Sequence, residues 1–384
     1  MRTWRCCAPP TPRAGTPASQ AWRTPEPEGF FAPAVLAVES GDALQLRQVA
    51  AAAAQVEVED GICDASLVGA FGWVSRKVLE GLVVKMASSG SPLARYLAAA
   101  ALHLHRTPPG DLLWPLLEDD VDAVRARALQ LAGEVGVAGS IERVRVNLAH
   151  GSAQVRFRAA SAAVLLGEAQ PALDVLAEIA GGGSAEAPEA LALFLRAADL
   201  PRARRVLGQM TLSIEGAEGR AALRRLIEAC GAAGDVQLVP WLIRQLDDAA
   251  SARLTGEALR MITGLAVEAT SLTGASAGRG SAGLTDDPDD DNVAEDEDAG
   301  LPWPDAGAIA RWWQDNEHLF TPGLRYFMGQ PPHAAHCLRV LRHGHQRQRA
   351  AAAQHLCLLQ PGMPLFPTTA PAWRQQRWLD ALQA

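Results

Sequence analysis

Apolar positions between about residues 30 and 268 recur with helical spacing, in a region dominated by Ala, Leu, Val and Arg. Strands prefer β-branched and aromatic residues, and only 5% of the chain is aromatic. Three stretches share one order: a short side chain, an apolar residue, an arginine and an Ala-rich amphipathic run. They are Ser91–Leu104, Asp122–Gly136 and Ala153–Glu168. The pattern predicts three equivalent helices.

The spacing of these stretches indicates a structural repeat. Their arginines Arg95, Arg125 and Arg156 lie 30 and 31 positions apart, and a second helix is predicted between copies, as at Ile141–His150. A period near 30 with two helices per unit is typical of an α-solenoid, whose units stack because one unit cannot bury its own apolar faces. We therefore predict an all-α, HEAT-like helical-repeat solenoid over residues 30–268.

Further features extend this repeat. Gly136 and Gly167 close two of the stretches, and glycine readily adopts the left-handed conformation that follows a helix end. Leu223 and Leu254 anchor a looser, later pair that is again 31 residues apart. The arginine of each copy is expected to brace neighbouring repeats through hydrogen bonds to carbonyl groups or to an Asp.

The composition changes after residue 268. Residues 269–302 are first rich in Gly and Ser and then carry nine acidic residues between Thr285 and Asp298, which predicts a flexible, solvated linker. Residues 303–384 hold five of the ten Trp and are predicted to form a small, separate helical module. Its helices are expected over about 305–319, 334–341 and 345–359, and after Pro371.

The first 29 residues differ from the rest, because six prolines exclude a regular helix and no apolar period is present. We expect this segment to be disordered; a targeting presequence or a misassigned start are alternative interpretations. No apolar run approaches the ~20 residues of a membrane helix. The six Cys show no CxxC spacing, which favours reduced thiols in a cytoplasmic protein.

The net charge of −8 does not indicate a general nucleic-acid-binding protein. The charge is unevenly distributed, since residues 303–384 contain eight Arg and four acidic residues while the linker is strongly acidic. We expect the basic module to fold back near the acidic linker or onto an acidic face of the solenoid.

Candidate metal sites are incomplete. If Asp287 is taken as the first residue of an EF-hand calcium loop, Asn292 stands where the loop requires glycine and Asp298 where it requires glutamate. A solvated acidic tether is therefore favoured over a calcium site. The His and Cys residues near the C-terminus lack a recognised zinc-ligand spacing, and a structural role is favoured for them. They are His333, His336, His343, His345, His355, Cys337 and Cys357. No metal or cofactor is therefore predicted.

No catalytic motif is present, because the chain lacks a nucleophile elbow, a phosphate-binding loop and a His-Glu-x-x-His zinc motif. The basic stretch Arg342–Arg349 is suited to a phosphate or to an acidic partner, or else it braces its own module. Nucleic acid is disfavoured there because no aromatic residue is interleaved. Our candidates for partner contact are Trp312, Trp313, Arg342, Arg347 and Arg349.

Three stretches resemble an uncharacterised bacterial family of HEAT-repeat-containing proteins. They are FFAPAVLAVESGD, PWPDAGAIARWWQDNEHLFTPGLRYFMGQP and LRHGHQRQRAAAAQHLCLLQPGMPLFPTTAPAWRQQRWL. The resemblance spans roughly residues 28–384, whereas residues 1–27 differ from the family's usual start. It implies a HEAT fold, no known activity, and a role accessory to contractile secretion machinery. Asp120, Val124 and Arg125 resemble the motif that opens the second helix of such repeats.

The sequence therefore predicts a protein-binding scaffold or adaptor whose extended solenoid surface holds a protein partner, rather than nucleic acid or a membrane. The alternative is a lyase-like or chaperone-like enzyme with a cofactor or substrate in the groove, by analogy with HEAT-like bilin lyases. A third hypothesis is that the acidic tract mimics nucleic acid.

Overall fold

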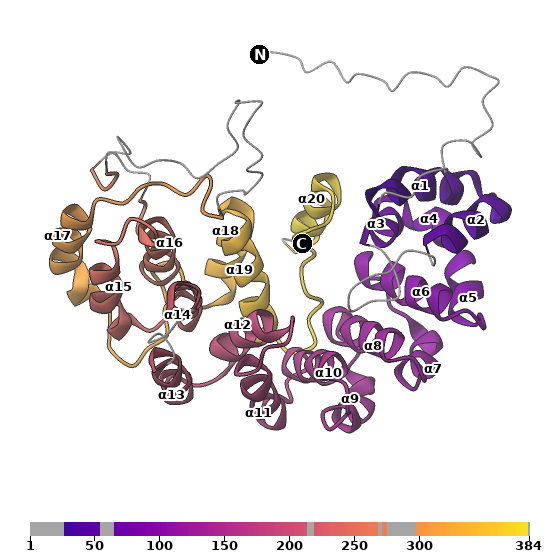
Figure 1. The fold of residues 1–384 in the computed structure, drawn as a ribbon, viewed down its shortest axis with the longest axis horizontal. Helices are drawn as coiled ribbons and strands as arrows, with labels where there is room; N and C mark the ends of the chain where they lie inside the picture. Colours follow the sequence, from indigo (N-terminus) through magenta and orange to yellow (C-terminus); the bar gives the residue numbers. More distant parts are fainter. Residues whose placement is uncertain (1–26, 54–64, 213–218, 268–270, 275–296, 383–384) are drawn as a thin grey trace, which may run out of the picture. The chain divides into compact units, whose positions relative to one another are not determined.

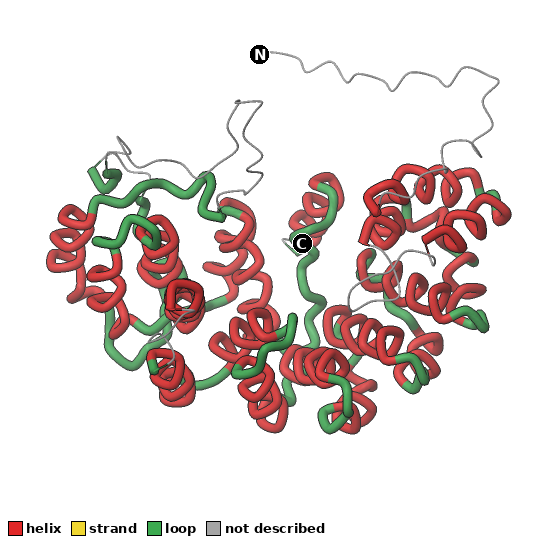
Figure 2. Tube along the Cα trace, viewed as in Figure 1, coloured by secondary structure: helices red, strands yellow, loops and turns green. Residues whose placement is uncertain are grey.

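The computed structural model describes residues 27–53, 65–212, 219–267, 271–274 and 297–382. Helices make up the regular structure of these ranges, which contain isolated β-bridges but no strand (Figures 1 and 2). The prediction of an all-α protein is confirmed. The expected N-terminal segment, except for its last residues, and most of the expected acidic linker lie outside the described residues. No helix of the described ranges is long and apolar enough to cross a membrane.

The chain divides into two compact units, residues 1–101 and 102–384. This boundary differs from the composition change at 268–303, because residues on both sides of that change belong to the second unit. In the first unit α1 packs against both α2 and α3. Its helices are α1 (Phe31–Ser40), α2 (Ala43–Ala53), α3 (Ala65–Trp73), α4 (Arg76–Leu79), α5 (Leu82–Ala87) and most of α6 (Pro92–Leu104).

The second unit contains a series of helices that pack successively, α8 on α10, α10 on α11, α11 on α12, α12 on α14 and α14 on α16. Short helices lie between several of these members. The helices are α7 (Leu113–Leu117), α8 (Asp122–Val135), α9 (Ile141–Asn147), α10 (Ala153–Leu165), α11 (Ala169–Ala180), α12 (Ala187–Ala197), α13 (Leu200–Thr211), α14 (Gly219–Ala233), α15 (Val239–Gln245) and α16 (Ala252–Thr263).

Small residues allow these helices to approach closely. A Cβ atom at Gly133 of α8 would lie 2.5 Å from the Cα of Ala162 of α10, so only glycine fits there. The helix ends follow the sequence: Gly136 caps α8 with φ of 81°, Gly264 caps α16 with φ of 72°, and the Asp199 carboxylate accepts a hydrogen bond at the start of α13. The prediction of a left-handed glycine at 136 is confirmed.

The C-terminal helices agree closely with the predicted ranges. They are α17 (Ala306–Asn316), which continues into a 3₁₀ turn over Glu317–Leu319, α18 (Ala334–His343), α19 (Gln346–Leu359) and α20 (Ala372–Ala381). Around α18 and α19 lies a core that includes Phe327, Cys337, Leu356 and Phe366, together with Met261 of α16. Helix α19 also packs against α10 and α12.

Two segments of the C-terminal region cross the carboxyl ends of the earlier helices. The first is residues 325–329: the backbone N–H of Tyr326 donates to Gly234 O at 2.8 Å, and that of Met328 donates to Met261 O at 2.7 Å. Arg325 adds side-chain hydrogen bonds to the carbonyl groups of Arg196, Ala198 and Ala233. The ends of α12, α14 and α16 are thereby joined to this segment.

The second segment is residues 360–366, which crosses the ends of α8 and α10. Gly362 donates its N–H to Leu165 O at 2.9 Å, and Leu365 donates to Glu134 O at 2.8 Å. A side chain at Gly136 would collide with the Gly362 carbonyl, so this crossing depends on glycine. Carbonyl groups left open at five helix ends are therefore satisfied by the chain's own later residues.

Candidate functional site

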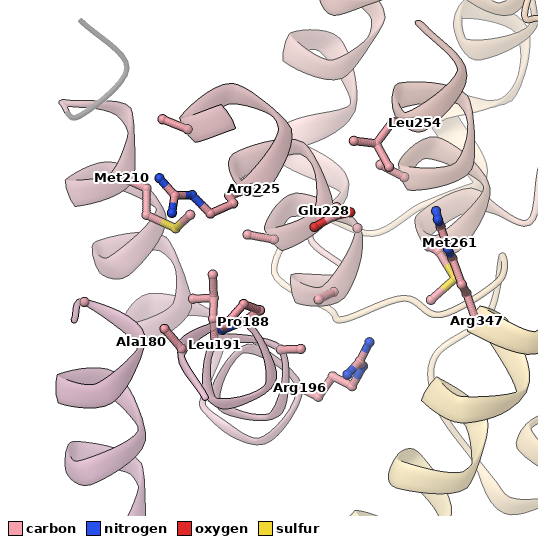
Figure 3. Close-up of a pocket in the computed structure, with 18 of the residues that line it drawn as sticks. Ala180, Pro188, Leu191, Arg196, Met210, Arg225, Glu228, Leu254, Met261 and Arg347 are labelled. Carbon is pink, nitrogen blue, oxygen red and sulfur yellow. The ribbon is translucent and has the colours of Figure 1, made fainter. Parts of the chain in front are cut away.

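A cavity of about 590 Å³ lies among α12, α14 and α16 of the second unit (Figure 3). The loop Gly181–Gly183, between α11 and α12, forms part of its wall, and Arg347 of α19 adds to another part. Its volume is in the usual range for ligand sites, about 300–1,000 Å³. Most of the wall is contributed by apolar side chains, with a few charged groups among them.

Helical periodicity explains how the cavity walls form. Helix α12 contributes Pro188, Leu191, Ala192 and Arg196, which follow one another at intervals of three, one and four and so share one face. Helix α14 contributes a corresponding face that includes Arg225, Glu228 and Ala232. The recess therefore follows the two helices for more than two turns.

Arg196 is the least compensated charge at this site. One of its terminal nitrogens donates to Gln354 Oε1 at 2.6 Å, while its Nε is buried without a hydrogen-bond partner. Burial, followed by the nearby charge of Arg325, lowers the pKa of Arg196 to about 10. In the described part of the chain, Arg196 has no carboxylate within ion-pair distance.

Two carboxylates and two further arginines, Arg225 and Arg347, complete the charged set. Partial burial raises the pKa of both Glu228 and Glu257, and the charge of Arg347 partly offsets this effect at each of them. Glu257 also accepts a hydrogen bond from Gln348 at 3.1 Å. Arg347 itself is exposed, and within the described ranges it makes no hydrogen bond or ion pair. A further polar group, the buried Oγ of Ser184, lines the cavity without a partner.

The repeated arginines have a common local role. Arg95 donates to Ser89 O at 3.0 Å, Arg125 to Asp119 O at 2.9 Å and Arg156 to His150 O at 3.1 Å. Each acceptor lies six residues earlier, in the turn directly before the arginine's own helix. The expected contacts with carbonyl groups are thus present. They connect each arginine's helix to the turn before it and not to a neighbouring repeat. Arg156 also reaches a later helix, through Glu178 of α11 at 3.3 Å.

The five candidates for partner contact do not form one surface patch. Trp313 is buried beside Phe320, with ring centroids 5.4 Å apart, and Trp312 is half-buried. Arg342 donates to Leu379 O at 3.0 Å and Arg349 to Leu341 O at 2.8 Å, so both brace α18, α19 and α20. Arg347 alone of the five lines the cavity.

Among the C-terminal His and Cys residues, His336 and His355 both pack against the ring of Phe327. His336 donates its Nε2–H to the Phe327 carbonyl at 2.7 Å, and the ring of His355 packs on Phe327 with centroids 4.7 Å apart. Burial raises the pKa of the Cys337 thiol to about 11 and that of Cys357 to about 12. Within the described ranges, no three His, Cys, Asp or Glu side chains gather as a metal site.

Sequence reasoning missed Arg196, Ser184 and Glu257 as members of a site. Their signal in the sequence is weak: Arg196 is a charge on the strongly apolar helix Ala187–Ala197. Comparisons with family models, with curated proteins and with solved structures found no match to this chain. The cavity's own chemistry therefore provides the basis for a functional proposal.

Proposed function

We propose that the chain is a HEAT-like α-solenoid that acts as a scaffold or adaptor and holds a segment of a partner protein in the cavity among α12, α14 and α16. Three polar side-chain contacts support the repeat interpretation, because their members are 31 residues apart, one sequence period. They are His103–Glu134 at 2.8 Å, Arg158–Glu189 at 3.4 Å and Arg204–Asp235 at 2.5 Å.

The cavity itself is the observation that carries the binding proposal. Residues 325–329 and 360–366 of the same chain cover the carboxyl ends of five helices, and α12, α14 and α16 are among them. Beside α12 and α14, in contrast, an apolar recess of about 590 Å³ remains, with an arginine Nε and a serine Oγ that lack partners. Buried polar groups without partners are uncommon in folded proteins, and an external ligand is one way to satisfy them.

Binding is favoured over nucleophilic catalysis by the state of the described cysteines. Cys230, Cys337 and Cys357 are buried, and burial raises the pKa of each thiol, so the reactive thiolate is disfavoured. None of the three lines the cavity. An adaptor role beside secretion machinery remains a prediction from the resemblance.

Site-specific photo-crosslinking tests this proposal. A benzophenone amino acid at Ala192, which lines the cavity, should capture one defined partner in cells of the host. The same group at Ala221, an exposed position of α14 outside the cavity, should not capture that protein. Equal capture from both positions, or only small-molecule adducts from Ala192, would contradict a protein-binding cavity.

A further inference from the structure

One end of the cavity carries two arginines, Arg196 and Arg347, that form no ion pair within the described residues, although the charge of Arg347 also acts on Glu228 and Glu257. Arg347 belongs to α19, and among the described residues the Arg196 side chain of α12 donates only to Gln354 of that same helix. Figure 3 shows the Arg196 guanidinium directed towards the side of the cavity where Arg347 lies. A buried cation without an anion is costly, so an incoming carboxylate would be strongly favoured at this end.

We propose that the cavity binds an extended acidic peptide segment, with a carboxylate held between Arg196 and Arg347 and apolar side chains against the remaining walls. This inference rests on the proposed protein-binding function and specifies the chemistry of the partner. Leu191, Met210, Leu254 and Met261 supply apolar surface, and the unpartnered hydroxyl of Ser184 is available to a peptide backbone group.

The length of the recess favours a peptide over a compact anion. Pro188 and Arg196 line the same face and are eight residues apart, which corresponds to about 12 Å along a helix. About four residues of an extended chain span that distance. A free phosphate or acetate would occupy only the arginine end and would leave the apolar walls uncovered.

The acidic residues of the cavity restrict where the ligand's charge can lie. Glu228 and Glu257 belong to α14 and α16, so a second ligand carboxylate near them would be repelled. The expected segment therefore has acidic character at one end and aliphatic side chains along the rest. Arg225 lines the opposite part of α14, nearer Met210 (Figure 3).

Selection of random peptides displayed on phage against the full chain tests this inference. We expect enrichment of sequences with Asp or Glu beside apolar residues. A synthetic copy of the enriched peptide should bind the Arg347→Gln variant about tenfold more weakly, which equals about 1.4 kcal/mol. Arg347 is exposed and unpaired in the described ranges, so folding should not change. Arg196→Gln should weaken binding similarly, whereas Arg205→Gln, on α13 outside the cavity, should not.

Each of the other possible outcomes would overturn a specific part of the proposal. Enriched peptides without acidic residues, whose binding is still blocked by Ala192→Trp, would refute the acidic chemistry and retain the proposed function. Absence of any enriched peptide would count against both. If inorganic phosphate displaced the peptide at a concentration equal to that of the peptide, the ligand of the cavity would be a small anion and not a peptide.

Discussion

Arg106 and Arg196 lie in two regions of the same unit, and burial lowers the pKa of both. Arg106 donates to the Glu134 carboxylate at 2.6 Å, to His103 O at 2.6 Å and to Leu365 O at 2.7 Å. Arg196 has one amide acceptor, Gln354, and a neighbouring positive charge. Arg106 thus joins several segments through its acceptors, whereas Arg196 has no carboxylate partner in the described ranges, and it is Arg196 that we propose binds a ligand.

The Arg106 region depends most on Glu134. Burial alone would raise the pKa of this carboxyl, but the charges of His103 and Arg106 lower it overall, so Glu134 is ionised in the folded protein. Because Leu365 both accepts from Arg106 and donates to Glu134 O, the same group of residues attaches the C-terminal crossing segment to α8.

The largest effect is expected for Glu134→Ala. Removing the carboxylate leaves the shielded Arg106 without its anion and His103 without a hydrogen-bond partner, which should lower the free energy of unfolding by about 3–5 kcal/mol. Urea unfolding followed by circular dichroism measures the change. Glu118→Ala, which removes an exposed partner of Arg143 at 2.8 Å, is the control and should cost under about 0.5 kcal/mol. Equal losses in the two variants would show that Glu134 does not fasten this region.

A somewhat smaller effect is expected where the crossing segment meets glycine. Gly136→Ala places a methyl group against the Gly362 carbonyl in a left-handed conformation, and should cost about 3 kcal/mol. Gly110 has φ of 55° with no neighbour within 4 Å, so Gly110→Ala should cost only about 1 kcal/mol. A differential scanning calorimetry trace that shows equal shifts for both would argue against tight docking of residues 360–366.

The region around Arg196 should respond to pH through His355. Burial, then the charges of Arg196 and Arg325, lower the pKa of His355 to about 3, below its ordinary value of 6.5. Between pH 3 and 6.5, His355 is protonated in the unfolded chain but neutral in the folded protein. The free energy of unfolding therefore falls as the pH is lowered from 6.5 towards 3. One such site contributes about 1.4 kcal/mol per pH unit. Urea midpoints at several pH values should show a shallower slope for His355→Gln; an unchanged slope would contradict this assignment.

Local pattern was sufficient to predict the helices but not their long-range connections. The range 334–341 was predicted from the chain's own spacing, and α18 covers Ala334–His343. The hydrogen bond from Tyr326 to Gly234, in contrast, joins residues far apart in sequence and depends on how whole helices pack. The cavity was equally inaccessible, because it arises where facing side chains of α12 and α14 fail to fill the space between them.

The smallest change in stability is expected for Arg196→Met, the variant that tests most directly whether Arg196 differs in role from Arg106. The variant removes a hydrogen bond to Gln354 at 2.6 Å, which favours the folded state, but it also removes a cation that burial and Arg325 both disfavour. These contributions have opposite signs, and an apolar isostere often replaces a buried charge without loss. We therefore expect a change within about 0.5 kcal/mol. For Arg106→Met we expect a loss several times larger, because the buried Glu134 carboxylate would lose its arginine partner. Urea unfolding of the two variants side by side measures the difference. If Arg196→Met were as destabilising as Arg106→Met, Arg196 would be a structural brace, and the cavity would lose the charge that makes it a site for an acidic ligand.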